Sequence, residues 1–83
     1  MTTKTLKVTD GMRSFEDHAA FAVQKAGEFQ STIHISCGNM QANAKSLMGM
    51  MTMQFDAEYA AITADGADEI SACEALSDYL LSL

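Results

Sequence analysis

Proline and tryptophan are absent from this 83-residue sequence, and cysteine occurs only twice. Without proline, the chain has neither a typical linker signal nor a proline-rich ligand motif. Two cysteines, Cys37 and Cys73, are too few for the disulfide framework of a small secreted domain, so we expect reduced, buried thiols. No apolar run reaches the length of about 18 residues that a membrane-spanning helix needs, and residues 1–7 lack the apolar core of a signal peptide. These absences favour a cytoplasmic protein.

Cationic side chains are also scarce. Five Lys and Arg stand against eleven Asp and Glu, which gives a net charge of −6. Such a surface disfavours nucleic acid and anionic membranes as partners but suits a basic protein partner. Hydrophobic residues make up 48% of the chain, which is enough for a small core. We therefore expect one folded domain over residues 1–83.

Hydrophobic periodicity predicts four strands and three helices in the order β-α-β-β-α-β-α. The clearest strand is Thr32–Cys37, in which apolar residues alternate with polar ones, and Gly38-Asn39 forms the turn of a hairpin. The other expected strands are Thr5–Val8, Met40–Ala44 and Tyr59–Ala64. A sheet with helices on one face is an α+β open-faced sandwich.

We expect three helices: one at about Asp17–Ala26, a short one after Ser46, and one from Asp68 onward. Residues 12–17 are expected to form a loop. Asp68 or a neighbour is expected to cap the last helix. The apolar face of the first helix comprises Ala19, Ala20, Val23 and Ala26, widened by Phe21 and Ala22. The apolar stripe of the last comprises Ile70, Cys73, Leu76, Leu80 and Leu83.

Ser46 lies at a helix N-cap position, directly before an apolar segment. A serine hydroxyl there accepts a hydrogen bond from a free backbone amide, and this role alone explains the residue. A phosphate on the hydroxyl would place about two negative charges where the helix dipole favours them, so Ser46 is also a candidate phosphorylation site. The apolar residues that follow are Leu47, Met48, Met50 and Met51. Such residues suit either the core or an adaptable docking surface, and we expect them to divide between these two roles.

The two histidines suggest little independent chemistry. His18 lies in the first turn of a predicted helix, where it is either a polar surface residue or a phosphoacceptor. His34 and Cys37 lie three apart on a strand and point to opposite faces, so we expect no metal site and no cofactor. No Ser-His-Asp set and no glycine-rich phosphate loop stands out, so we expect neither an enzyme nor a small-molecule substrate.

Three segments occur in a familiar order: Lys4–Thr9, Ala44–Met51, and Gly66–Glu69 before the last helix. Together they resemble the HPr family of the bacterial sugar phosphotransferase system, in its HPr and Crh forms, over nearly the whole chain. The resemblance implies an HPr-like open-faced β-sandwich with a four-stranded antiparallel sheet. It also implies regulatory phosphorylation at Ser46 and a partner-docking surface comprising Leu47, Met48 and Met51. The implied partners are an HPr kinase/phosphorylase and a transcription regulator or metabolic enzyme.

The phosphocarrier loop of that family differs here. The family positions of the acceptor histidine, the assisting arginine and the proline hold Phe15, Asp17 and His18. Phe15 offers no nucleophilic nitrogen, and Asp17 would repel the phosphate that a guanidinium binds. Crh-type members also lack the histidine and keep the serine. We interpret the chain as a regulatory protein of sugar uptake or carbon catabolite control without histidine relay. The alternatives are a divergent phosphocarrier that uses His18 and a non-phosphorylated interaction scaffold.

Overall fold

The computed structural model describes all residues, 1–83, and its elements follow the predicted order with one added 3₁₀ helix, η1. The elements are β1 (Thr2–Lys7), η1 (Asp10–Asp17), α1 (Ala19–Gly27), β2 (Thr32–Cys37), β3 (Met40–Asn43), α2 (Leu47–Met51), β4 (Tyr59–Asp65) and α3 (Glu69–Leu81). The longest helix, α3, has 13 residues, and no helix is long and apolar enough to cross a bilayer.

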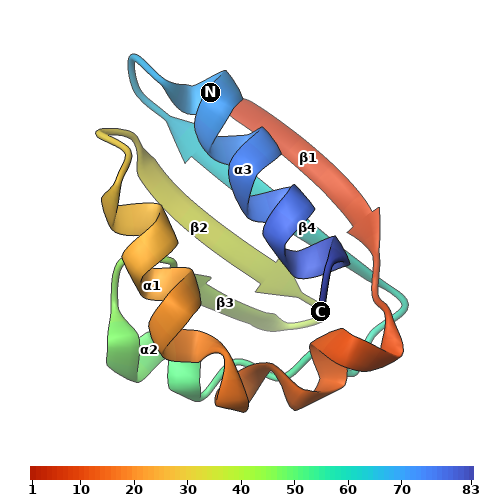
Figure 1. Cartoon of the computed structure of the whole chain (residues 1–83). Helices are drawn as coiled ribbons and strands as arrows, with labels where there is room; N and C mark the ends of the chain where they lie inside the picture. The colour runs from red at the N-terminus through yellow and green to blue at the C-terminus, as the bar shows by residue number, and fades with distance from the viewer.

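The four strands form one antiparallel sheet in the order β1-β4-β2-β3. Figure 1 shows α1 and α3 over the same face of this sheet, with α2 beside α1. The opposite face carries no helix. The predicted open-faced sandwich, with a four-stranded antiparallel sheet and helices on one face, is therefore confirmed.

Strand β2 shows why the sequence folds into this sheet. Ile33, Ile35 and Cys37 are buried, and the residues between them are not. Ile35 lies opposite Ala42 of β3 and Ile62 of β4, so apolar side chains from three strands meet on the face under the helices. Gly38, with a φ of +60°, makes the predicted turn to β3.

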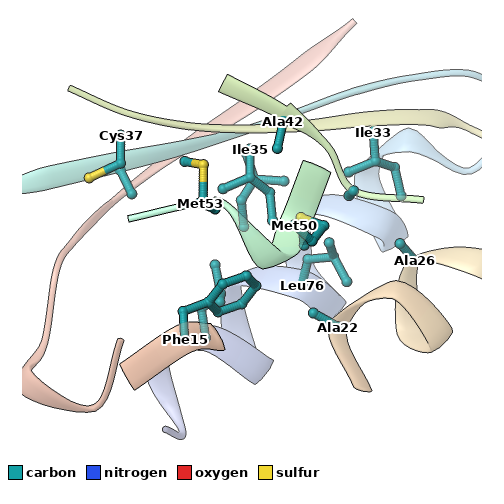
Figure 2. Packing of buried hydrophobic residues seen from close by; sticks show 14 of the residues in the cluster. Phe15, Ala22, Ala26, Ile33, Ile35, Cys37, Ala42, Met50, Met53 and Leu76 are labelled. Carbon is teal, nitrogen blue, oxygen red and sulfur yellow. The ribbon is translucent and has the colours of Figure 1, made fainter. Parts of the chain in front are cut away.

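The core lies between the sheet and the helices and draws on every element (Figure 2). In that view Phe15, Ile35, Met50 and Leu76 approach one another from η1, β2, α2 and α3. Each of these four side chains is at most 1% exposed. Burying such a side chain contributes about 1.5–3 kcal/mol, so the core holds the sheet and all four helices in one arrangement.

The loop predicted for residues 12–17 is wrong, because η1 covers that segment. Met12 and Phe15 are both buried and lie three residues apart, which is the repeat of a 3₁₀ helix. The following helix consequently begins at Ala19 rather than Asp17. The first strand also differs from its predicted bounds, since it begins at Thr2 and ends at Lys7.

Three predicted core positions are wrong as well: Ala20, Phe21 and Ile70 are all exposed. Phe21 is 65% exposed, and the fully buried residues of α1 are all small: Ala19, Ala22 and Ala26. These small side chains allow α1 to pack closely against α2 and α3, where a phenylalanine ring would not fit. Cys73, Leu76 and Leu80 of the predicted α3 stripe are buried, and Ala72 and Ser77 are buried beside them. Ile70 is 64% exposed, because it lies outside this buried face.

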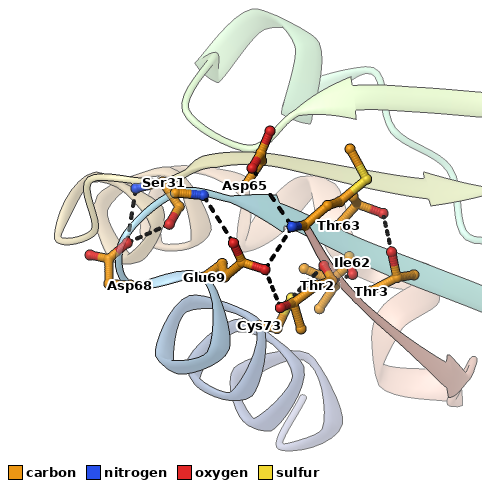
Figure 3. A network of polar contacts seen from close by, with 11 residues as sticks. Thr2, Thr3, Ser31, Ile62, Thr63, Asp65, Asp68, Glu69 and Cys73 are labelled. Carbon is orange, nitrogen blue, oxygen red and sulfur yellow. Dashed lines mark hydrogen bonds and ion pairs between the residues drawn. The ribbon is translucent and has the colours of Figure 1, made fainter.

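Asp68 is the N-cap residue of α3, as the sequence predicts, but its side chain makes no cap bond. Its carboxylate instead holds the connection between α1 and β2 (Figure 3). It accepts hydrogen bonds from the Ser31 amide at 2.9 Å, the Ser31 hydroxyl at 2.5 Å and the Gln30 amide at 2.8 Å. The Ser31 hydroxyl, followed by the Gln30 amide, lowers the pKa of Asp68 below its ordinary value of 3.8.

The first residue of α3 makes a second polar connection. Glu69 accepts a hydrogen bond from the Thr2 hydroxyl and pairs with the amine of Met1 at 2.9 Å (Figure 3). The Thr2 hydroxyl, followed by that amine, lowers the pKa of Glu69. Nearby, Gly66 has a φ of +157°, and a Cβ there would lie 2.7 Å from Ser31 Cα. The start of α3 is thus fixed to both β1 and the segment before β2.

Candidate functional site

The Ser46 hydroxyl caps α2, as the sequence predicts. Ser46 has extended backbone angles, φ −103° and ψ 113°, and its Oγ accepts the Gly49 amide at 3.3 Å. Its carbonyl accepts the Met50 amide at 2.9 Å, which begins the helical hydrogen bonding. The residue is only partly buried. A hydroxyl at the start of a short helix is therefore both held in place and open to solvent.

The residues after Ser46 divide between core and surface, as predicted. Met50 is fully buried and anchors α2 to the core. Leu47 is 46% exposed, Met48 82% and Met51 54%. We name these three residues the α2 patch. Three large apolar side chains on one short helix form a local apolar surface directly beside Ser46.

Phe21 adds an apolar side chain that the sequence analysis assigned to the core. It is exposed on α1, and α1 packs against α2 (Figure 1). The spacing of Ala19, Ala22 and Ala26 indicates that Phe21 is exposed, because these three small residues at helical intervals already form the buried face of α1. Phe21 then lies outside that face.

Phe15, which the sequence resemblance aligns with an acceptor histidine, belongs to the core. It is 1% exposed, and its ring meets the edge of Phe55 at a centroid distance of 5.0 Å and an interplanar angle of 68°. Such edge-on aromatic pairs contribute about 0.5–1.5 kcal/mol beyond burial. The side chain carries no atom that can accept a phosphoryl group.

Asp17 and His18 lie at the junction between η1 and α1. Asp17 is exposed and His18 is partly exposed. The His18 carbonyl accepts the Ala22 amide at 3.0 Å and the Tyr79 hydroxyl at 3.4 Å, so the backbone of this residue is well fixed. No hydrogen bond or ion pair joins its imidazole to another residue.

A shallow pocket of about 260 Å³ lies beside this junction. Its lining comprises Arg13, Glu16, Met53, Gln54, Phe55 and Asp56. The guanidinium of Arg13 is engaged, since Nη1 donates to the Phe55 carbonyl at 3.4 Å and Nε lies 3.9 Å from Asp10 Oδ1. The pocket wall thus carries the carboxylates of Glu16 and Asp56, and its one guanidinium, that of Arg13, is already paired. This arrangement does not suit a phosphoryl group.

The residues considered for metal binding lie apart. His34 is partly exposed on the open face of the sheet and Cys37 is buried on the other face, as the strand pattern predicts. No group of three His, Cys, Asp or Glu side chains is arranged to hold a metal ion. Cys37 and Cys73 are both free and buried, and burial raises the pKa of the Cys73 thiol.

Comparison with known proteins agrees with this geometry. The model of the family described as "PTS HPr component phosphorylation site" matches residues 3–82. HPr-C-His from Thermoanaerobacter tengcongensis is 32% identical with a TM-score of 0.83, and the match covers 99% of this chain and 93% of that one. Phosphocarrier protein HPr from Bacillus anthracis is 33% identical with a TM-score of 0.78, and the match covers 95% of each chain.

A Crh structure is similar as well. The match to Crh of Bacillus subtilis has 31% identity and a TM-score of 0.69, and it covers 93% of this chain and 85% of that one. The resemblance seen in the sequence is thereby confirmed over nearly the whole chain. This chain belongs to the HPr family of the bacterial phosphotransferase system, with both HPr and Crh proteins among its structural neighbours.

Proposed function

We propose that this chain is an HPr/Crh-like regulatory protein of the sugar phosphotransferase system or carbon catabolite control, switched by phosphorylation at Ser46. One observation carries the proposal. In a chain of this family, the Ser46 hydroxyl lies at the start of α2, partly exposed and directly beside the α2 patch. A partner docked on the patch would therefore have the hydroxyl within its contact surface.

The chemistry is a phosphoryl transfer from ATP. A bond forms between Ser46 Oγ and the γ-phosphorus, the bond to ADP breaks, and the hydroxyl proton is released. The product adds about 1.5–2 negative charges and three acceptor oxygens at this position. The Gly49 amide, which already donates to Oγ, remains available as a donor. The switch thus creates a new anionic surface and needs no refolding.

Two features support a role without histidine relay. Phe15 has no nucleophilic nitrogen and its ring is packed in the core. Asp17, at the family's arginine position, is exposed and negative, so it repels the phosphate that an arginine would bind. The chain then acts as a binding module without catalytic activity of its own.

The proposed partners follow from this role. An HPr kinase/phosphorylase would dock on Leu47, Met48 and Met51 to reach Ser46. A transcription regulator or metabolic enzyme would then bind the phosphorylated form through the same surface. Both partners place the chain in the cytoplasm.

The test is the intact mass of the protein after incubation with HPr kinase and ATP. We expect one phosphate on the parent protein and on Ser71→Ala, which removes an exposed hydroxyl from α3. We expect none on Ser46→Ala. Phosphate that persists on Ser46→Ala would overturn the site, and no phosphate on the parent would overturn the switch.

Two further variants, His18→Ala and Ser46→Asp, separate the two other functions. A phosphocarrier that uses His18 would take an acid-labile phosphate from phosphoenolpyruvate and enzyme I, and His18→Ala would lose it. An interaction scaffold would bind its partner equally well as Ser46→Asp and Ser46→Ala. Either result would replace the proposed function with that alternative.

A further inference from the structure

The methionines of this chain fall into two classes by exposure. Seven are present. Met12, Met50 and Met53 are buried in the core, and Met40 is partly buried. Met1, Met48 and Met51 are exposed. Two of the three exposed thioethers therefore belong to the five-residue helix α2, next to Ser46.

Met48 and Met51 lie on one side of that helix. Residues three apart in an α-helix are neighbours on its surface, so both sulfur atoms belong to the α2 patch. Met50, between them in sequence, is turned into the core and fully buried (Figure 2). One short helix thus holds two thioethers that a small oxidant can reach and one that it cannot.

We propose that Met48 and Met51 form an oxidation-sensitive modification site, through which a peroxide converts the α2 patch from an apolar into a polar surface. Hydrogen peroxide transfers one oxygen atom to each thioether sulfur. A sulfur–oxygen bond forms, the peroxide oxygen–oxygen bond breaks, and water leaves. The sulfur loses two electrons and the peroxide gains them. The product, methionine sulfoxide, is polar and disrupts methionine-rich contact surfaces.

This inference rests on the proposed function, because it concerns docking at the same patch. Polar sulfoxides at Met48 and Met51 weaken the docking of the kinase and slow phosphorylation of Ser46. Met50 keeps its thioether in the core, so the fold and the Ser46 cap persist. Methionine sulfoxide reductases reverse the modification. Oxidation and reduction of the two methionines thus control Ser46 phosphorylation reversibly, at the step at which the kinase docks.

The test treats the intact protein with hydrogen peroxide, removes the peroxide, and locates added oxygen by peptide mass. We expect Met1, Met48 and Met51 to be oxidised before Met12, Met50 and Met53. The initial rate of phosphorylation by HPr kinase is then compared with that of the same protein before treatment. We expect a fall of about tenfold, as for loss of a central interface side chain.

The matched control is the double variant Met48→Leu and Met51→Leu, which keeps two apolar side chains and cannot be oxidised there. Its own untreated rate is its reference, and we expect peroxide to leave that rate unchanged. The proposal is overturned if Met50 reacts as fast as Met48, if the parent rate does not change, or if the leucine variant slows equally.

Failure of the proposed function is distinguishable from failure of this inference. If the untreated parent takes no phosphate, the Ser46 switch fails. Retention on a hydrophobic-interaction column then decides whether oxidation removes the apolar surface. We expect the oxidised parent to lose more retention than the treated leucine variant, in which Met1 is the only exposed methionine left to oxidise. Unchanged retention of the oxidised parent would overturn the inference independently of the kinase.

Discussion

The η1 segment and helix α2 both carry large apolar side chains, but η1 turns them inward and α2 turns most of them outward. Met12 and Phe15 of η1 are buried, whereas Leu47, Met48 and Met51 of α2 are exposed. The buried side chains stabilise the fold and expose no reactive atom. The exposed ones contribute little to stability and leave an apolar surface for a partner to cover. This difference favours α2 over the η1–α1 junction as the functional surface.

The largest expected effect comes from the two phenylalanines on either side of that junction. Phe15→Ala is expected to lower the free energy of unfolding by about 3–5 kcal/mol, because it removes a buried ring and its contact with Phe55. The matched control Phe21→Ala removes an exposed ring and should cost about 0.5 kcal/mol or less. Urea unfolding of both variants measures the difference, and equal midpoints would contradict the assignment of Phe15 to the core.

The second comparison lies within α2. Met50→Ala is expected to lower the free energy of unfolding by about 2–5 kcal/mol, since it leaves a cavity in the core. Met48→Ala should cost about 0.5 kcal/mol or less, because that side chain is exposed. Thermal unfolding of the two variants distinguishes them. Similar melting temperatures would show that α2 is not anchored by Met50.

A smaller effect is expected at the helix cap. Ser46→Ala removes the acceptor of the Gly49 amide and should cost about 1 kcal/mol. Ser46→Asp retains a capping oxygen and should cost less. Urea unfolding of the two variants gives the comparison. If both unfold like the parent, the hydroxyl contributes nothing as a cap, and a serine at this position needs another explanation.

The smallest effect is expected from pH, because the carboxylates concerned, Asp68 and Glu69, are in partial contact with solvent, which screens their interactions. The pKa values of Asp68 and Glu69 are lowered in the folded protein, so the unfolded chain binds more protons in that range. Their stabilising contribution is present above the ordinary carboxyl pKa and is lost as pH falls through the folded pKa. Unfolding at pH 6 and pH 3 should therefore show a smaller loss for Asp68→Asn than for the parent protein.

The control for the pH experiment is Asp78→Asn, which changes an exposed carboxylate on α3 that accepts no side-chain hydrogen bond in the structure. This variant should lose as much stability between pH 6 and pH 3 as the parent. An equal loss in Asp68→Asn and Asp78→Asn would show that the bonds to Ser31 and Gln30 do not couple folding to pH.

Local patterns predicted much of this fold. The bounds of β2 and the Ser46 cap follow from alternation and from capping chemistry, which depend on adjacent residues. The sequence pattern does not predict η1, because the three-residue spacing of its buried side chains differs from the period of an α-helix. Asp68 lies at the predicted helix start, but its side-chain bonds could not be predicted, because their partners, Gln30 and Ser31, are distant in sequence and are brought near only by the tertiary fold.

The candidate site was predicted unevenly. The division of the residues after Ser46 into core and surface was anticipated from methionine chemistry, and Met50 is the residue that the core takes. The exposure of Phe21 does not follow from the sequence pattern, because an aromatic residue beside a helical apolar stripe is expected to widen that stripe. Phosphorylation of Ser46 and docking on the α2 patch remain predictions, because each depends on a second protein as well as on this chain.

The contact between Phe15 and Phe55 also has a consequence for engineering this chain. A histidine placed at position 15 would not give a surface imidazole, because the position is enclosed by the core. The imidazole would be buried among apolar groups unless η1 and the Phe55 segment rearranged. A histidine acceptor at this position therefore requires changes in the packing around it as well as the substitution itself.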